Sequence, residues 1–302
     1  MVSRLRDRPL WATVALAIAI AVGTLVDRVP TSAPQRAGEY VVLAGDFHVH
    51  AFPGDGSLAP WTLRQEAARA GLDVFAVTNH NMVFTARFAE WMASSSGGSS
   101  RASAVTPRES SGPIVIAGQE ITNPEYHLIA VGLTRTVNAD QPAADAIRDV
   151  HAQGGVAIAA HPTPRFHGYD DDQTVALLDG TEAAHPVDRV SGQEEFTAFF
   201  ERARRLKPSI APIGSSDFHV SPAVAACRTL VFAREATAAG VIEAIRSGRT
   251  VAVDQFGHRH GEASLIQLLD TMPDVDRPAD TTIWRRASLV LAWTALLALL
   301  VL

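Results

Sequence analysis

The chain has 302 residues, of which 47% are hydrophobic and 19% charged, with a formal net charge of −6. This composition is typical of a globular protein with a substantial core, and the mild acidity gives no support to nucleic-acid binding. The single cysteine, Cys227, excludes an internal disulfide and a cysteine-rich zinc site. A bound metal ion would therefore need ligands from His, Asp and Glu.

The chain begins with an uncharged apolar run, Leu10–Val26, that follows Arg4, Arg6 and Arg8. Its length is near the lower limit of about 17 residues for a membrane-spanning helix. The arginines predict a cytoplasmic N-terminus. A cleaved signal peptide shares these features, but no clear small-x-small cleavage site follows Val26. We therefore interpret residues 1–30 as a membrane anchor rather than as a cleaved signal peptide.

The middle of the chain alternates short apolar runs with helical stretches, after a predicted linker at 31–39. The apolar runs predict strands at 41–43, 74–77, 114–117, 127–131, 156–160 and 210–213. Helices are predicted at 60–70, 143–153 and 194–206. Repeated strand–helix units favour a parallel sheet or a barrel. Residues 94–112 are rich in serine and glycine and predict a surface loop.

Two histidines stand one residue apart at the end of the first predicted strand. His48 and His50 project from the same face because side chains alternate along a strand, and Asp55 follows in the next turn. Two adjacent imidazoles are costly to bury unless their nitrogens have a partner, and a metal ion is a common one. On this motif alone, a pair of exposed histidines is an equal alternative.

Further residues that can bind metals occur at the ends of the later predicted strands. They are His80, Glu120, His127, His161, Asp217 and His219. In barrels of alternating strands and helices, catalytic groups gather at the rim where the strands end. This repeated placement favours one metal site over separate, internally satisfied core residues.

The ordered set of motifs resembles the polymerase and histidinol phosphatase (PHP) superfamily. The motifs, from Gly45 to about Val253, are H-x-H followed by D-G, T-x-H-N, G-x-E, a single His, A-H-P after Gly-Gly, and S-D-x-H. The resemblance implies an α/β fold, a distorted (β/α)7 barrel with two or three divalent ions (Mn, Fe or Zn) that hydrolyses phosphate esters. The closing segment, Ala239–Val253, resembles the membrane-anchored CehA/McbA-like branch, which also includes amide and carbamate hydrolases.

The resemblance also implies roles for individual residues. The first ion would be held by His48, His50 and Asp217, the second by His127 and His161, and the third by Asp55, His80 and His219. Glu120 would bridge the first two ions and, with Asp217, support catalysis through a metal-bound hydroxide. Asn79 stands where the family usually has Asp, so His80 would lose a charged orienting partner.

Other polar residues have less specific interpretations. Arg165, four residues after His161, is a candidate clamp for the substrate phosphate, because a guanidinium fork matches phosphate oxygens; an ordinary surface arginine is the alternative. Five histidines lie outside the motifs: His151, His167, His185, His258 and His260. We interpret His151 as a surface residue, His185 as structural, and the last two as loop residues.

The C-terminal residues 283–302 form a second apolar run and predict a transmembrane helix, with a buried core helix as the alternative. Residues 256–282 would then be a connector. Two spans would place both termini in the cytoplasm and the barrel, residues 40–255, outside the cell membrane. The sequence therefore predicts a membrane-anchored, metal-dependent phosphoesterase of a small-molecule substrate. The alternatives are an amide or carbamate hydrolase on the same metals and a non-catalytic metal-binding or sensory domain.

Overall fold

The computed structural model describes residues 8–26, 34–95, 112–186, 193–272 and 282–301. The chain divides into two compact units, Thr31–Asp276 and a smaller one made of Met1–Pro30 with Arg277–Leu302. Most of the predicted surface loop at 94–112 lies outside the described residues.

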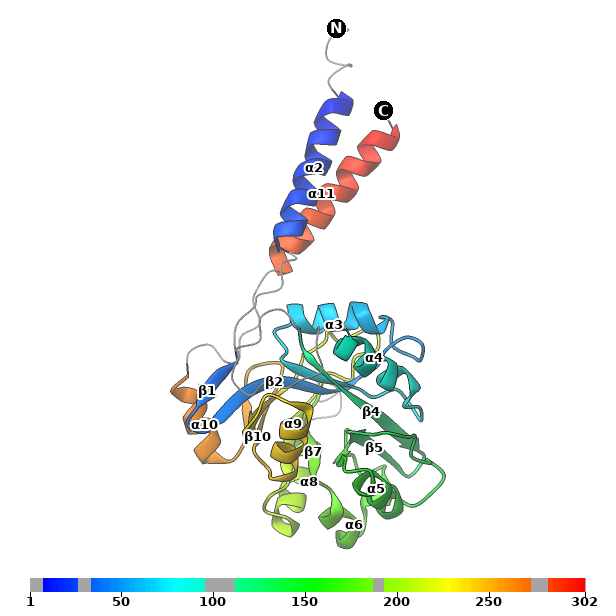
Figure 1. Ribbon diagram of the computed structural model, residues 1–302, viewed down its shortest axis with the longest axis vertical. Helices are drawn as coiled ribbons and strands as arrows, with labels where there is room; N and C mark the ends of the chain where they lie inside the picture. The colour runs from blue at the N-terminus through cyan, green and yellow to red at the C-terminus, as the bar shows by residue number, and fades with distance from the viewer. Residues whose placement is uncertain (1–7, 27–33, 96–111, 187–192, 273–281, 302) are drawn as a thin grey trace. The chain divides into compact units, whose positions relative to one another are not determined.

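The smaller unit consists of α2 (Arg8–Val26) and α11 (Thr282–Val301), which run side by side (Figure 1). None of the described helices is both long enough and apolar enough to cross a membrane. The charged residues Arg8 in α2 and Arg285 and Arg286 in α11 shorten the uncharged part of each helix below its full 19 and 20 residues. The predictions of flanking transmembrane helices, of membrane association through them and of an anchored barrel outside the membrane are therefore wrong.

The larger unit is built on a curled sheet whose strands follow the order β11-β10-β9-β2-β3-β4-β5-β6-β7-β8, with β1 on β2. The strands are β1 (Gln35–Ala37), β2 (Tyr40–Val49), β3 (Val74–Val77), β4 (Ile114–Asn123), β5 (Tyr126–Val131), β6 (Val156–Ala159), β7 (Gly180–Ala184), β8 (Ala211–Gly214), β9 (Arg228–Ala233), β10 (Thr250–Val253) and β11 (Arg259–Gly261). The central strands are buried almost throughout, which explains why they appear in the sequence as continuous apolar runs.

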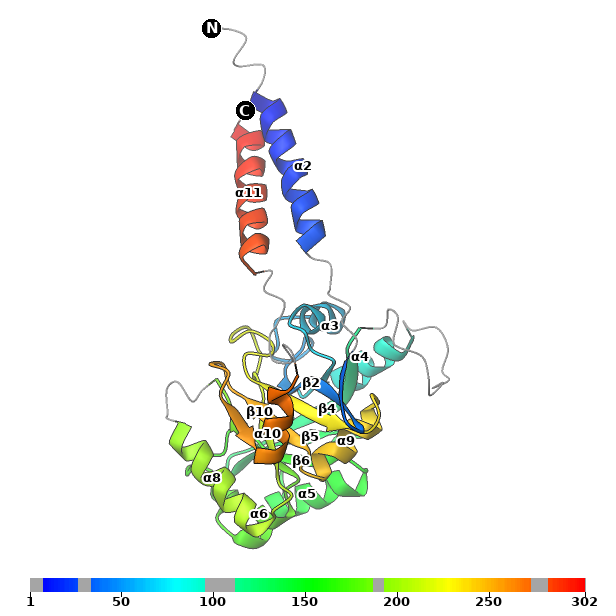
Figure 2. The ribbon, with the colours of Figure 1, turned by 90° about the vertical axis from the view of Figure 1, so that its left-hand side faces the viewer.

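Helices cover the sheet on its outside. They are α3 (Pro60–Arg69), α4 (Phe84–Ser95), α5 (Ala143–Ala152), the short 3-10 helix η1 (His167–Tyr169), α6 (Asp172–Leu177), α8 (Gln193–Leu206), α9 (Ala238–Arg246) and α10 (Ala263–Asp270). Within this unit α3 and α4 lie at one end, and α5, α6 and α8 at the other (Figures 1 and 2). On α5, Ala143, Ala146, Ile147 and Val150 are buried. Their helical spacing gives the apolar face that packs on the sheet. The segment predicted as a connector, 256–282, contains β11 and α10.

The sheet is not uniformly parallel. β2, β3 and β4 are parallel, and so are β6, β7 and β8, but β5 is antiparallel to both of its neighbours. β4 and β5 form a hairpin in which Asn123 pairs with Tyr126, and so short a connection cannot hold a crossover helix. The barrel-like α/β architecture fits the prediction, and this hairpin is a place where no helix separates two consecutive strands. As a result, the start of β5 lies at the same rim as the end of β4.

Threonine hydroxyl groups help to close the curled sheet. The Thr229 hydroxyl on β9 accepts a hydrogen bond from Gly214 N (3.0 Å) and donates one to Gly214 O (2.9 Å) on β8. The Thr250 hydroxyl on β10 donates to Pro212 O (2.9 Å). Both threonines are fully buried, so these bonds are formed away from water. They connect the last parallel strand to the antiparallel strands on the other side of the barrel.

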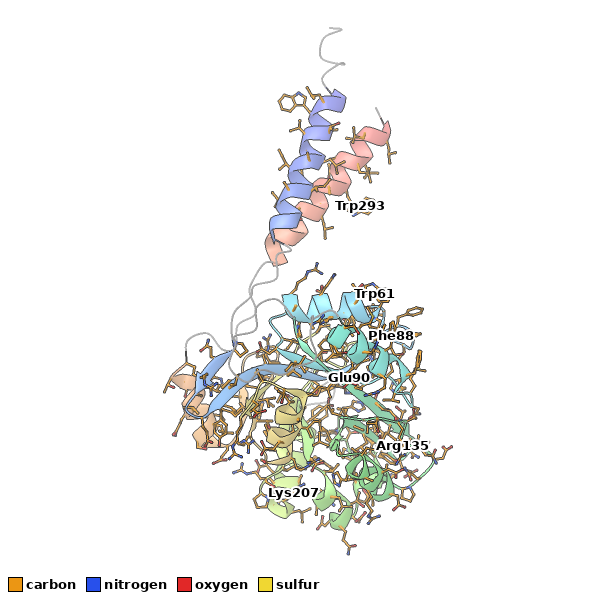
Figure 3. The ribbon with its side chains drawn as sticks, in the orientation of Figure 1. Trp61, Phe88, Glu90, Arg135, Lys207 and Trp293 are labelled. Atoms are coloured by element: carbon orange, nitrogen blue, oxygen red, sulfur yellow. The ribbon has the colours of Figure 1, made fainter. Side chains whose placement is uncertain are left out.

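A buried aspartate joins three elements on the outer side of the sheet. Asp179, which is 2% exposed, accepts hydrogen bonds from Ala157 N (2.9 Å) and His151 Nε2 (2.7 Å). Nζ of Lys207, a residue labelled in Figure 3, lies 3.4 Å from the other Asp179 oxygen. Burial alone would raise the pKa of Asp179, but the hydrogen bonds, that of His151 first, lower it. His151, which the sequence suggested was a surface residue, is thus half-buried in an ion-pair network.

We expect Asp179→Asn to lower the free energy of unfolding by about 1–3 kcal/mol, because the amide removes the negative charge that faces His151 and Lys207 and replaces one buried acceptor oxygen by an NH2 group. The matched control is Asp149→Asn, since Asp149 is 39% exposed, forms an ion pair with Arg135 at 3.9 Å and accepts a 3.4 Å hydrogen bond from Gln141 Nε2 that an amide oxygen can keep. It should change stability by at most about 1 kcal/mol. Urea denaturation near pH 7 measures both. Because the pKa of Asp179 is lowered on folding, its contribution should be present above the ordinary Asp pKa and be lost as the pH falls through the folded-state value. Equal stability of the two variants would contradict this account.

Candidate metal centre

The structure brings all nine predicted ligands together at one rim of the sheet. They form overlapping groups in which one ligand atom per residue lies within 4.8 Å of the others. Three of these groups are His48, His50, Glu120 and Asp217; Glu120, His127 and His161; and His50, Asp55, His80 and His219. A fourth group adds two residues that were not predicted as ligands, Glu182 and His185, beside His48. The nine side chains are thus neighbours, and their role as ligands stays a prediction.

The first group contains four buried atoms that point at one another. His48 Nε2 lies 3.3 Å from Glu120 Oε2 and 3.1 Å from Asp217 Oδ1, and His50 Nε2 lies 3.4 and 3.3 Å from the same two oxygens. None of these four atoms has a hydrogen-bond partner of acceptable geometry within the described part of the chain. Because buried polar atoms are normally hydrogen-bonded, such a convergence of imidazole and carboxylate atoms fits a cation.

Glu120 faces the second group with its other carboxylate oxygen. Glu120 Oε1 lies 2.8 Å from His127 Nδ1 and 3.2 Å from His161 Nε2. The side chain is 1% exposed, and the surrounding imidazoles, His48 first, outweigh burial and hold its pKa well below the usual value. An ionised carboxylate with one oxygen toward each ligand group has the geometry of a bridge between two cations. His127 reaches this position because β5 runs antiparallel to β4.

The third group is more open than the other two. Asp55 Oδ2 lies 3.0 Å from both His80 Nε2 and His219 Nε2, and Asp55 Oδ1 lies 3.0 Å from His50 Nδ1. The side chains of Asp55, His80 and His219 are 39%, 37% and 31% exposed. The aspartate thus touches both the open group and a ligand of the buried one. Gly56 has to be glycine here, since a Cβ atom would lie 2.1 Å from the His50 carbonyl oxygen.

The side chain of Asn79 bonds to the loop before Asp55 and not to the ring of His80, contrary to the orienting role expected at this position. Its side chain accepts a hydrogen bond from Ala51 N (2.8 Å) and donates to Ala51 O (2.8 Å) and Pro53 O (2.9 Å). His80 Nδ1 is instead 2.6 Å from the hydroxyl of Thr122. The amide therefore fixes the loop that leads to Asp55, and a hydroxyl group positions the histidine.

Sequence reasoning missed the carboxylate that lies behind His48. Glu182 Oε1 accepts hydrogen bonds from His48 Nδ1 (3.0 Å) and the Ser215 hydroxyl (2.7 Å), and Oε2 accepts one from His161 N (2.5 Å). Burial opposes its ionisation, but the rings of His185 and His48 lower the pKa of Glu182 to about 2. A carboxylate that holds Nδ1–H leaves Nε2 of His48 free to bind a cation.

His185, which we interpreted as structural, lies beside the predicted ligands. It is fully buried, and its Nε2 lies 3.5 Å from Asp217 Oδ2 and 3.7 Å from Glu182 Oε2. Its Ala-His-Pro motif repeats that of His161, which was the signal available in the sequence. β7, which carries Glu182, consists of small and polar residues (GTEAA) and does not have the apolar pattern by which the other strands were predicted.

The backbone is strained at two of the candidate ligands. His161 has a φ of 28° and Asp217 a φ of 49°, in the left-handed region that non-glycine residues rarely adopt. Such strain persists where the surrounding structure holds it, and it occurs often at functional sites. His161 lies two residues after the end of β6, and Asp217 lies three residues after the end of β8.

A cavity of about 670 Å³ opens onto the ligand groups. Arg165 and Glu195 line it, together with the ligands His127 and His161. The guanidinium of Arg165 lies 4.6 Å above the ring of Phe166, and that ring packs on His127 with a centroid distance of 4.9 Å. The structure therefore places Arg165 at the cavity, and its phosphate-binding role stays a prediction.

Comparison with known proteins supports the same fold. Residues 201–250 match a family model described as PHP-associated. The chain is similar to a two-domain protein from Bacteroides vulgatus containing a predicted PHP-like metal-dependent phosphoesterase, with 21% identity over 80% of this chain and 73% of that one, and a TM-score of 0.59. PsfC from Pseudomonas syringae is 15% identical over 82% of this chain and 98% of its own, with a TM-score of 0.48. A candidate metal-dependent phosphoesterase from Bifidobacterium adolescentis is 18% identical over 58% of this chain and 87% of its own, with a TM-score of 0.42.

A search of curated proteins finds no match. The likeness to the Bacteroides vulgatus protein and the match to the PHP-associated model show that the larger unit has the fold of PHP-like metal-dependent phosphoesterases. They do not confirm the CehA/McbA-like branch, which stays a prediction.

The position of Glu182 predicts that Glu182→Gln weakens metal binding about 10- to 100-fold, as is typical when a carboxylate behind a ligating histidine is replaced. Titration of the metal-free protein with Zn²⁺ or Mn²⁺ measures the affinity, and circular dichroism checks the fold. The control is Glu125→Gln at an exposed position outside the ligand groups. Unchanged affinity in a folded Glu182→Gln protein would show that this carboxylate does not orient His48.

Proposed function

We propose that the larger unit is a metal-dependent phosphoesterase that hydrolyses phosphate esters of small molecules. The observation that carries the proposal is the placement of Glu120, whose two oxygens face the His48 group and the His127–His161 group at 2.8–3.4 Å. A bridging carboxylate between two sets of imidazoles suits a pair of divalent ions that act on one phosphate. The fold shared with PHP-like proteins supports the same reaction class.

The types of ligand atom determine which metal ions the centre would bind. Its ligand groups contain only imidazole and carboxylate atoms, which suit Mn, Fe or Zn. One ion would be held by the His48 group and one by His127 and His161, with Glu120 shared, while Asp55, His80 and His219 could hold a third. Bound ions of this kind supply positive charge for phosphate oxygens and lower the pKa of a water molecule.

The chain's own residues would bind and orient the substrate around this centre. Arg165, held over Phe166, would donate two parallel hydrogen bonds to phosphate oxygens. Glu182 and Thr122 would hold His48 and His80 in fixed orientations through their Nδ1 atoms. The cavity of about 670 Å³ is large enough for an organic substituent in addition to the phosphate. A non-catalytic metal site would not require this cavity beside the ligands.

Metal removal tests the reaction class. Protein treated with a chelator should lose phosphoesterase activity, and Mn²⁺, Fe²⁺ or Zn²⁺ should restore it, because imidazoles and carboxylates alone provide no comparable charge for the phosphate. Activity is measured on a panel of phosphomonoesters, phosphodiesters and carbamates. Full activity of the chelated protein would refute the proposal, and restored activity on carbamates alone would assign the site to amide or carbamate hydrolysis.

The inner and outer ligand groups should respond differently to mutation. Glu120→Gln should remove most metal affinity and nearly all activity, because the amide has only one oxygen. Asp55→Asn should keep the inner ions and lower the rate by about 10²–10³, the usual loss for one charge-stabilising group. Asn is chosen over Ala because its side-chain oxygen can still accept the hydrogen bond that His50 Nδ1 donates to Asp55 Oδ1 at 3.0 Å in the wild-type protein.

Metal analysis and hydrolysis rates of both proteins provide the readout. If Asp55→Asn empties every site, or if Glu120→Gln keeps nearly normal activity, the assignment of ligands to the inner and outer groups is incorrect.

A further inference from the structure

A second cavity, of about 600 Å³, also opens onto the ligand groups. Asp217 and His219 line both cavities, so the two meet at these side chains. The two oxygens of Asp217 face different neighbours. Oδ1 lies 3.1 Å from Nε2 of His48, and Oδ2 lies 3.5 Å from Nε2 of His185, a residue that lines the second cavity. A phosphate at the ligand groups would therefore have space on two sides.

The walls of the two cavities differ in charge. Arg165 and Glu195 line the first, and neither forms an ion pair with any residue in the described part of the chain. Thr163 contributes a buried hydroxyl that has no hydrogen-bond partner among the described residues and also lines the first cavity. Beyond the histidines and Asp217, the second cavity is walled by uncharged residues, among them Ser221, Ala223 and Gln255.

We propose that the substrate is a phosphodiester, with its phosphate at the ligand groups and one substituent in each cavity. This inference rests on the proposed phosphoesterase function. A monoester has a single organic substituent and would leave one cavity without a role, whereas each cavity has the size of a typical small-molecule pocket, roughly 300–1,000 Å³. The substituent in the first cavity carries charged or hydrogen-bonding groups that meet Arg165, Glu195 and Thr163. The substituent in the second is neutral and polar, such as a hydroxylated alcohol.

The reaction is a simple hydrolysis. The oxygen of one water molecule forms a bond to phosphorus, and the bond between phosphorus and one ester oxygen breaks. The released alkoxide takes up a proton from the attacking water. The products are one phosphomonoester and one alcohol, and no oxidant, reductant or second substrate is consumed.

The test uses a substitution that narrows the second cavity and leaves the candidate metal ligands unchanged. Ala223 is exposed and lies in the wall of this cavity, so Ala223→Phe should fill part of it. The matched control, Ala236→Phe, changes an exposed alanine that lines neither cavity. The probes are bis(4-nitrophenyl) phosphate and 4-nitrophenyl phosphate, which share one leaving group and differ in the second substituent.

For the metal-loaded wild-type protein, we expect kcat/KM on the diester to exceed that on the monoester at least about tenfold. Ala223→Phe should lower kcat/KM for the diester about tenfold or more, in the range that a changed pocket contact produces, while the monoester value stays within about twofold of the wild type. Ala236→Phe should change neither. A thermal melt checks that Ala223→Phe is folded, and Ser221→Phe, at another exposed position of the same wall, serves as a second variant.

Equal or faster hydrolysis of the monoester by the wild-type protein would overturn the diester assignment and leave the phosphoesterase function intact. The diester assignment would also be overturned if Ala223→Phe and Ser221→Phe lowered kcat/KM for the diester and the monoester equally. If the metal-loaded wild-type protein hydrolyses neither probe nor any other phosphate ester, the proposed function fails and the inference fails with it.

Discussion

The whole centre depends on one buried carboxylate. Glu120 is 1% exposed, and an ionised group at such a position is tolerated only where cations or hydrogen-bond donors compensate it. The imidazoles of His48, His50, His127 and His161 surround it at 2.8–3.4 Å. Because these rings come from β2, β5 and the end of β6, the charge of Glu120 links strands on both sides of β4. The charge of Glu120 is therefore compensated by the same imidazoles that form the candidate ligand groups.

The β4–β5 hairpin is the feature of the fold that makes this arrangement possible. β4 continues beyond its parallel partner β3 to Asn123, and β5 returns along it, so that Thr122 pairs with His127. A crossover helix at this point would have placed the next strand parallel to β4, with its first residues at the opposite rim. The antiparallel strand instead brings a histidine at its start to the level of Glu120. The interruption of the repeated strand–helix pattern is thus a requirement of the site.

The sequence allowed most of the candidate ligands to be found, because each stands beside a short apolar strand and its type is chemically specific. It did not reveal Glu182, since β7 lacks a hydrophobic pattern and the contact with His48 joins residues 134 positions apart. His185 was assigned a structural role because its motif follows that same strand. The terminal helices were predicted as membrane spans from their apolar composition, but none of the described helices is long and apolar enough to be a span, and α11 includes two arginines among its 20 residues.

Asn79 shows that an expectation drawn from a resemblance has to be checked against the geometry at each position. An aspartate at 79 could accept the hydrogen bond from Ala51 N but could not donate to Ala51 O and Pro53 O, as the amide does. These three bonds hold the loop between His50 and Asp55, which carries the carboxylate of the open ligand group. The amide of Asn79 therefore fixes this loop, while His80 Nδ1 faces the Thr122 hydroxyl at 2.6 Å and Glu120 Oε2 at 2.8 Å. The charge of the open group then comes from Asp55, whose position depends on a neutral side chain.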